Sequence, residues 1–240
     1  MNLKIILKKI LTLLHIDATK NMQYDRLTNK ILKSELREDS NCIDIGSHRG
    51  EILELFIQYA SKGRHFAFEP VPFLFEGLTE KYSLRARISS LALSDIKGEA
   101  NFKYVKNAPA YSGLQTRKYD IKHPVVEDIF VQVNTLDEVI PEDLRLDLVK
   151  IDVEGAEFHV LKGGRSLLKK WKPVIIFECG LGASDYYKTD PGELFDFICG
   201  ELDMKLYTLP AYANGKKVLN HEQFTDIYWS NSEYYFVAAE

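Results

Sequence analysis

Short apolar runs alternate with helical stretches along most of this chain, and this pattern constrains the fold more than any other feature. The apolar runs are hydrophobic throughout rather than at every second position, which indicates strands that are buried on both faces. Such strands, alternating with helices, predict an α/β sheet that is mostly parallel and has helices on both sides. We expect strands at 41–46, 65–69, 87–93, 146–152, 174–178, 205–209 and 234–238. We expect helices at 24–36, 51–60, 73–82, 157–170 and 192–199.

The composition agrees with a globular protein of one enlarged domain. The chain has 240 residues, of which 45% are hydrophobic and 28% charged, and no repeat or Pro/Gly-rich linker divides it. The formal net charge of −4 argues against a dedicated nucleic-acid-binding protein, which normally carries a basic surplus. The three cysteines, Cys42, Cys179 and Cys199, are odd in number and form no C-x-x-C pair. We interpret them as core residues of a protein in a reducing compartment and expect a cytoplasmic location.

The N-terminal segment forms an imperfect amphipathic pattern. Three lysines interrupt its apolar residues, so it fits neither a signal peptide nor a membrane-spanning helix. Three interpretations remain open for this segment: a helix packed on its own domain, a dimer contact or a membrane-surface anchor. We favour the first two together over the third. The residues of the apolar face are Leu3, Ile6, Leu7, Ile10 and Leu14.

Acidic residues stand at or just after five of the predicted strands. In an open parallel sheet, ligands bind beyond the carboxyl ends of the strands. Carboxylates gathered there predict a site for a polyhydroxylated or cationic ligand. The five strand ends read Asp44-Ile45-Gly46, Glu69-Pro70, Ser94-Asp95, Asp152-Val153-Glu154 and Glu178-Cys179-Gly180.

The segment from Asp44 to Gly50 reads DIGSHRG and leads into a helix. Gly46 allows a sharp turn and a close approach of a ligand to the backbone, and Gly50 opens the helix, whose free N–H groups favour an anionic group. The dinucleotide-binding fingerprint needs a third glycine, which is absent here. The loop therefore favours a ligand without a pyrophosphate.

Two further strand ends complete the predicted site. Glu69 follows Asp44 by 25 residues, a spacing at which an acid accepts hydrogen bonds from a ribose diol, and Pro70 stiffens the turn that carries it. Asp152, Glu154 and Glu157 crowd the mouth of a central strand, which raises the pKa of at least one carboxyl unless a cation lies between them. Lys150, a metal or a positively charged cofactor such as a sulfonium is a candidate for that cation.

At these residues the chain resembles the FkbM-type methyltransferases, a branch of the S-adenosylmethionine-dependent (SAM-dependent) class I methyltransferases. The matching motifs are DIGSHRG (44–50), FEPVP (68–72), ALSDIKGEANF (92–102), NTLDEVI (134–140), VKIDVEGAEFHVLKGG (149–164) and PVIIFE (173–178). The resemblance implies a Rossmann-like α/β sheet of seven strands, mostly parallel, with the last strand antiparallel. It also implies O-methylation of a hydroxyl group, often on a sugar or natural product.

The resemblance also implies roles for individual residues. The methionine portion of SAM would be held by Asp44, Gly46, Ser47 and Gly50. The ribose would be bound by Glu69 with Pro70 beside it, and the adenine would be flanked by Ser94 and Asp95. Asp152 would lie beside the methyl group and the acceptor. Two positions depart from the family pattern: His48 replaces a common Asn, and Gly113 replaces the second serine of a Ser-Ser-Leu.

Methyl transfer to an alcohol needs the acceptor aligned, water excluded and a proton removed. Asp152 is our first candidate for the proton acceptor and His123 the second. A divalent metal is not expected, although Asp152 and Glu178 would be its ligands. Tyr186, Tyr187 and Tyr212 would line an acceptor pocket or cap the edge of the sheet.

Two alternatives from other classes remain: an NAD-dependent Rossmann oxidoreductase, and a non-catalytic scaffold with the same fold. We predict a helical cap over residues 1–40 and a methyltransferase domain over residues 41–240. The expected partner is a small-molecule or glycan acceptor, whose identity no motif in the loops reveals.

Overall fold

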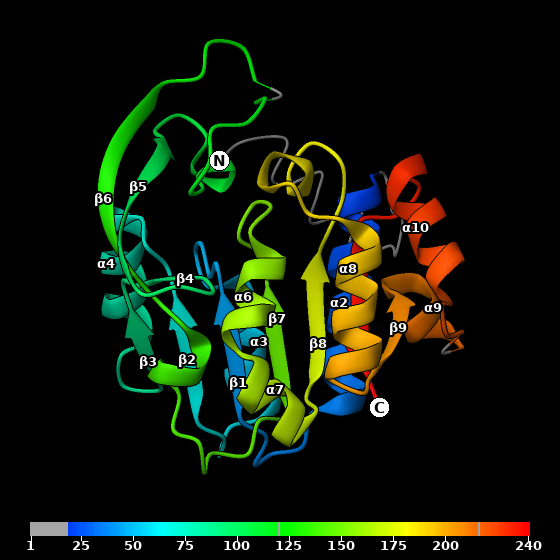
Figure 1. The fold of residues 1–240 in the computed structure, drawn as a ribbon. Helices are drawn as coiled ribbons and strands as arrows, with labels where there is room; N and C mark the ends of the chain where they lie inside the picture. The colour runs from blue at the N-terminus through cyan, green and yellow to red at the C-terminus, as the bar shows by residue number, and fades with distance from the viewer. Residues whose placement is uncertain (1–18, 120, 216) are drawn as a thin grey trace.

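The computed structural model describes residues 19–119, 121–215 and 217–240 (Figure 1). The apolar face predicted over residues 3–14 lies outside the described residues. In the part that is described, no helix is long and apolar enough to cross a membrane.

A seven-stranded sheet forms the centre of the molecule, in the order β3-β2-β1-β7-β8-β10-β9. Strand β10 runs antiparallel to both of its neighbours, and the other pairings are parallel. The predicted seven-stranded α/β sheet with its last strand antiparallel is thus confirmed. The strands are β1 Cys42–Ile45, β2 His65–Phe68, β3 Ala86–Ser89, β7 Leu148–Ile151, β8 Val174–Glu178, β9 Lys205–Thr208 and β10 Tyr235–Ala239.

Helices cover both faces of this sheet (Figure 1). One face packs on α2, α3, α4 and α9, and the other on α5 to α8 and α10. The helices are α2 Lys20–Glu35, α3 Glu51–Tyr59, α4 Pro72–Tyr82, α5 Leu136–Val139, α6 Glu157–Gly163, α7 Arg165–Trp171, α8 Pro191–Asp196, α9 Leu209–Asn214 and α10 His221–Ser230. Shorter turns are η1 Pro109–Tyr111, η2 Ser184–Tyr187 and η3 Phe197–Glu201.

Helix α2 is held on the sheet by one apolar face. The side chain of Thr19 accepts a hydrogen bond from the Met22 N–H and caps the helix at its start. Tyr24, Leu27 and Ile31 recur at helical spacing and are almost fully buried, in one cluster with residues of β1, β7, β8 and β10. Burial of each such side chain contributes about 1.5–3 kcal/mol, so this helix is a firmly packed part of the molecule.

A second, three-stranded sheet stands beside the first, in the order β4-β6-β5. Its strands are β4 Ala92–Leu93, β5 Gly98–Val105 and β6 Val126–Asn134. The prediction of one continuous strand over residues 87–93 is wrong. Its first half forms β3 beside β2, whereas its second half leaves that sheet and pairs with β6.

Two other predicted elements differ. The helix expected over residues 157–170 is split at Gly164, where the chain passes so close to Leu136 that a Cβ atom would lie 2.7 Å from its side chain. The sequence pattern did not predict α5, α9 or α10. The last of these carries a capping box between Asn220 and Gln223, which is a readable helix-start signal.

Candidate active site

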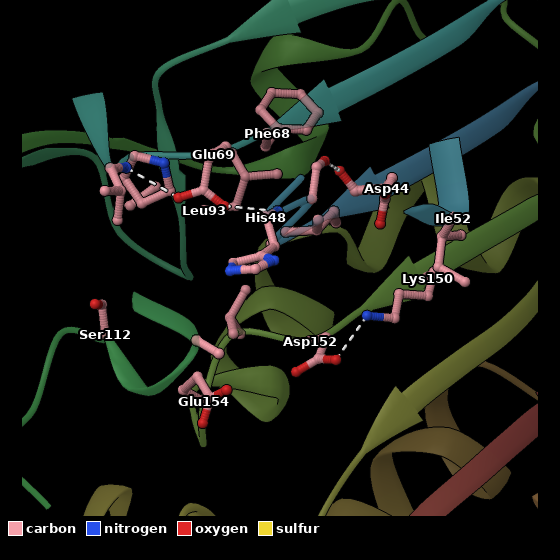
Figure 2. Close-up of a pocket in the computed structure, with 18 of the residues that line it drawn as sticks. Asp44, His48, Ile52, Phe68, Glu69, Leu93, Ser112, Lys150, Asp152 and Glu154 are labelled. Atoms are coloured by element: carbon pink, nitrogen blue, oxygen red, sulfur yellow. Dashed lines mark hydrogen bonds and ion pairs between the residues drawn. The ribbon is translucent and has the colours of Figure 1, made fainter. Parts of the chain in front are cut away.

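A cavity of about 650 Å³ opens at the carboxyl ends of β1, β2 and β7 (Figure 2). This is the edge at which open parallel sheets bind ligands. Of the predicted site residues, the cavity is lined by Asp44, Gly46, Ser47, Glu69, Pro70 and Asp152, together with His48, Lys150 and Glu154.

Asp44 is a buried carboxylate without a hydrogen-bonding partner. It is 1% exposed, and neither of its oxygens has a partner within the described part of the chain. Burial raises the pKa of Asp44 to about 6, and the charge of Asp152 adds to this, while Lys150 and the nearby backbone N–H of Leu53 act in the opposite direction. An unpaired carboxylate at the wall of a cavity fits a ligand that carries a positive charge or a hydrogen-bond donor.

Gly46 lets the first loop meet the fourth strand end at van der Waals distance. Its φ is +77°, and a Cβ atom would lie 1.8 Å from the carbonyl oxygen of Asp152. Gly50 has a different surrounding, because it does not line the cavity and its Cβ atom would lie 2.6 Å from the ring of Tyr82. The structure therefore places Gly46 at the cavity and Gly50 in the packing behind it.

Glu69 is fixed by backbone groups on both of its oxygens. Oε2 accepts from the His48 N–H at 2.8 Å and Oε1 from the Val71 N–H at 3.0 Å. Burial raises the pKa of Glu69 to about 7, although both hydrogen bonds oppose this. His48 has a φ of +48°. His and Asn both adopt this conformation more readily than most residues, so His48 fits the backbone of this turn.

Asp152 is held in its ionised form by its neighbours. Its Oδ2 accepts from Lys150 Nζ at 2.7 Å and from the Tyr235 hydroxyl at 2.7 Å. Removal from water raises the pKa of Asp152, but the Lys150 ammonium and the hydrogen bonds from Lys150, Tyr235 and Glu178 outweigh this and hold the pKa below its usual value. The second oxygen of Asp152 points away from Lys150 (Figure 2).

The neighbouring carboxyls favour the protonated form. Burial and the charge of Asp152 raise the pKa of Glu154 to about 8, and they raise that of Glu178 well above its usual value. Burial also raises the pKa of Glu157 to about 7. Glu157 Oε1 accepts from two backbone N–H groups, at residues 153 and 155, and so shapes the loop that carries Glu154. The charge of Asp152 thus makes Glu154 and Glu178 harder to ionise, while Arg117 acts in the opposite direction on Glu154.

The segment after β5 covers one side of the cavity, which Ser112 helps to line. Arg117 forms an ion pair with Glu154 and donates to the carbonyl of Gly182 at 3.1 Å. Gln115 donates its N–H to the hydroxyl of Tyr187 at 3.0 Å. These contacts hold the segment against the loops that follow β7 and β8.

Several predicted residues lie elsewhere. His123 is exposed and outside the cavity lining. Ser94 and Asp95 do not line the cavity either, and the carboxylate of Asp95 pairs with His159 at 3.0 Å and Lys162 at 3.2 Å. The structure does not bring His123, Ser94 or Asp95 to the cavity, and their functional roles stay predictions.

The three tyrosines of the predicted acceptor pocket also lie outside the lining. Tyr212 packs in the core beside α2, and its hydroxyl donates to Glu35 at 3.0 Å. Tyr186 is 40% exposed. No group of three or more His, Cys, Asp or Glu among the described residues is arranged to hold a metal ion.

Sequence reasoning missed two contributions to the site. Tyr235, in the last strand, contacts Asp152, and Asn21 and Asp25 of α2 line the cavity. No local motif marks any of these residues. They meet the site only because α2 and β10 pack beside β7 and β8.

Comparison with known proteins gives a consistent result. The model of the Methyltransferase FkbM domain matches residues 44–206. The chain is 26% identical to 2-O-methyltransferase NoeI of Sinorhizobium fredii, over 56% of this chain and 61% of that protein. It is 30% identical to hexuronic acid methyltransferase AglP of Haloferax volcanii, over 66% of this chain and 64% of that protein. The matches therefore span less than two thirds of either relative.

A solved structure shows the same fold. The crystal structure of methyltransferase FkbM from Methylobacillus flagellatus is similar with a TM-score of 0.53 and 15% identity. The match covers 88% of this chain and 47% of that chain.

Proposed function

Because the chain belongs to the FkbM methyltransferase family, we propose that it is a SAM-dependent O-methyltransferase that acts on a hydroxyl group of a sugar or natural product. The observation that carries this proposal is that two carboxylates of different surroundings line one cavity. Asp44 is buried and unpaired, and Asp152 is held ionised on the neighbouring strand end.

The residues at the cavity fit the cofactor. The unpaired oxygens of Asp44 suit an ammonium group, and Glu69 retains acceptor capacity for a ribose diol. Gly46 keeps the loop free of side-chain atoms where the backbone is closest to Asp152. When bound, SAM supplies a methyl group on a positively charged sulfur, which makes the methyl carbon electrophilic.

We assign Asp152 the role of general base for the acceptor. It is ionised, lines the cavity and has one oxygen turned away from Lys150 (Figure 2). In that position the oxygen would accept the proton that the acceptor hydroxyl gives up during methyl transfer. The segment around Ser112 lines one side of the cavity, where it would help to exclude water from the reaction.

The acceptor class rests on the relatives. One is named a 2-O-methyltransferase and the other a hexuronic acid methyltransferase. We propose a sugar hydroxyl on this basis, with the neutral and the acidic sugar as the two classes to compare.

The test is methyl transfer from radiolabelled SAM to two acceptors, methyl α-D-glucopyranoside and methyl β-D-glucuronide. Transfer of label to either supports the proposal, and the ratio of the two rates assigns the sugar class. The Asp152→Asn protein keeps the size of the side chain and is expected to lose at least about 100-fold in rate. Full activity of this variant would remove Asp152 from the role of base.

A further inference from the structure

Tyr235 lies outside the matched family region and nevertheless contacts the central carboxylate. The family match ends at residue 206, and Tyr235 begins β10, 83 residues after Asp152. Its hydroxyl donates to Asp152 Oδ2 at 2.7 Å, the same oxygen that accepts from Lys150 Nζ. Tyr235 does not line the cavity. It contacts Asp152 from β10, which is separated from β7 by β8.

The position of Tyr235 is fixed by its neighbours. In the antiparallel register it is paired with Glu178 of β8, and its ring lies 5.1 Å from the ring of Tyr24 in α2, between centroids. Tyr24 is 2% exposed and is itself held by a hydrogen bond to Glu233. The Tyr235 ring is thus packed between a strand and a helix, which restricts the direction of its hydroxyl.

Two donors on a single oxygen have a directional consequence. Lys150 and Tyr235 both engage Oδ2, so rotation of the Asp152 carboxylate would break two charge-assisted hydrogen bonds. The other oxygen therefore stays turned away from Lys150 (Figure 2). Donors to the ionised form also favour ionisation.

We propose that Tyr235 is a positioning residue, which with Lys150 fixes Oδ2 of Asp152 and presents Oδ1, ionised, to the acceptor hydroxyl. The use of Oδ1 by an acceptor rests on the proposed function. The effect of Tyr235 on the ionisation of Asp152 does not depend on the proposed function, so the two claims are tested separately.

Other groups act on the same carboxylate and must be accounted for in a titration. Each stays in place in the comparison below, so the difference between the proteins isolates Tyr235. These groups are Asp44, Lys150, Glu154, Glu157 and Glu178.

The experiment is a titration of protein labelled with ¹³C at the aspartate side-chain carboxyl, followed by NMR in the full chain without ligand. Asp152→Asn identifies the Asp152 signal. We expect the midpoint of that signal to rise by about 1 unit in Tyr235→Phe, since one donor to the ionised form is removed. Tyr59→Phe is the matched control, because it loses a hydroxyl that donates to Asn29 at 2.8 Å, outside the cavity lining.

An unchanged midpoint in folded Tyr235→Phe overturns the proposal, whether or not activity falls. If that variant does not fold, wild type labelled at tyrosine Cζ gives the same test against Asp152→Asn. One tyrosine signal must then titrate with Asp152 and lose this titration in Asp152→Asn, and its absence overturns the proposal. If the wild type transfers no methyl group but the Asp152 midpoint still rises in Tyr235→Phe, the proposed function fails and the positioning role stands.

Discussion

The backbone of Gly46 and the carbonyl oxygen of Asp152 are in direct contact, so closely that a Cβ atom on Gly46 would lie 1.8 Å from that oxygen. The Asp152 N–H also donates to the Ile45 carbonyl at 2.9 Å. The loop after β1 and the loop after β7 are therefore packed as one unit. A side chain at position 46 would therefore displace Asp152, which we propose as the general base for the acceptor.

The first prediction concerns this contact. Gly46→Ala adds a methyl group where the backbone has a φ of +77° and no space. We expect the free energy of unfolding to fall by about 1–3 kcal/mol or more and the affinity for SAM to fall at least about 10-fold. Urea unfolding and calorimetry measure the two effects. Gly77→Ala in α4 is the control, because a Cβ atom there meets nothing within 4 Å. This substitution should raise the free energy of unfolding by about 0.5–1 kcal/mol. Wild-type affinity in Gly46→Ala would contradict the prediction.

The second prediction concerns Glu69 and the ribose. With a pKa of about 7, Glu69 is mostly protonated at pH 6 and mostly ionised at pH 8, and the ionised form is the better acceptor for a diol. 5′-Methylthioadenosine carries the ribose without the charged amino-acid portion. Its affinity should rise about 5–10-fold from pH 6 to pH 8 in the wild type, as the ionised fraction does. In Glu69→Gln the affinity should be weaker and flat with pH. A flat profile in the wild type would remove Glu69 from ribose binding.

The third prediction concerns stability and pH. The pKa of buried Glu157 is raised from 4.5 to about 7 in the folded protein, so the folded state holds this proton more tightly than the unfolded state. Its contribution is therefore present below pH 4.5 and is lost as the pH rises to about 7, by up to about 3 kcal/mol. Glu157→Gln does not titrate, so its stability relative to wild type should improve from pH 5 to pH 8. Urea unfolding at both pH values measures this, and a constant difference would mean that Glu157 titrates normally.

The fourth prediction concerns the segment that covers the cavity. Arg117→Ala removes the ion pair with Glu154 and the bond to the Gly182 carbonyl. We expect amide exchange at Gln115 to speed up about 10-fold, because a hydrogen bond to a charged group contributes about 1.5–3 kcal/mol. Lys118→Ala is the control, since it removes a neighbouring positive charge. Equal exchange in the two variants would show that the Arg117 contacts do not hold the segment.

The sequence predicted the residues at the cavity that lie at strand ends. Asp44, Glu69 and Asp152 each stand at or just after the end of a predicted strand, and in an open parallel sheet this position predicts that they lie at one edge. The number of strands in the sheet and the antiparallel last strand came from the family resemblance. Both are confirmed by the structure.

The remaining features depend on contacts that no local pattern encodes. Tyr235 meets Asp152 only because β10 inserts between β8 and β9, and β4 leaves the main sheet because β6 pairs with it. His123 was selected from its type in a loop, and loop sequence carries no information about distance. The structure places it on the surface.

The central claim is that the cavity between Asp44 and Asp152 binds SAM. Isothermal titration calorimetry with SAM, S-adenosylhomocysteine and NAD on the folded chain tests it most directly. We expect one site for SAM and for S-adenosylhomocysteine, no heat for NAD, and a loss of binding in Asp44→Asn. If the folded protein binds neither SAM nor S-adenosylhomocysteine at millimolar concentration, the claim is wrong.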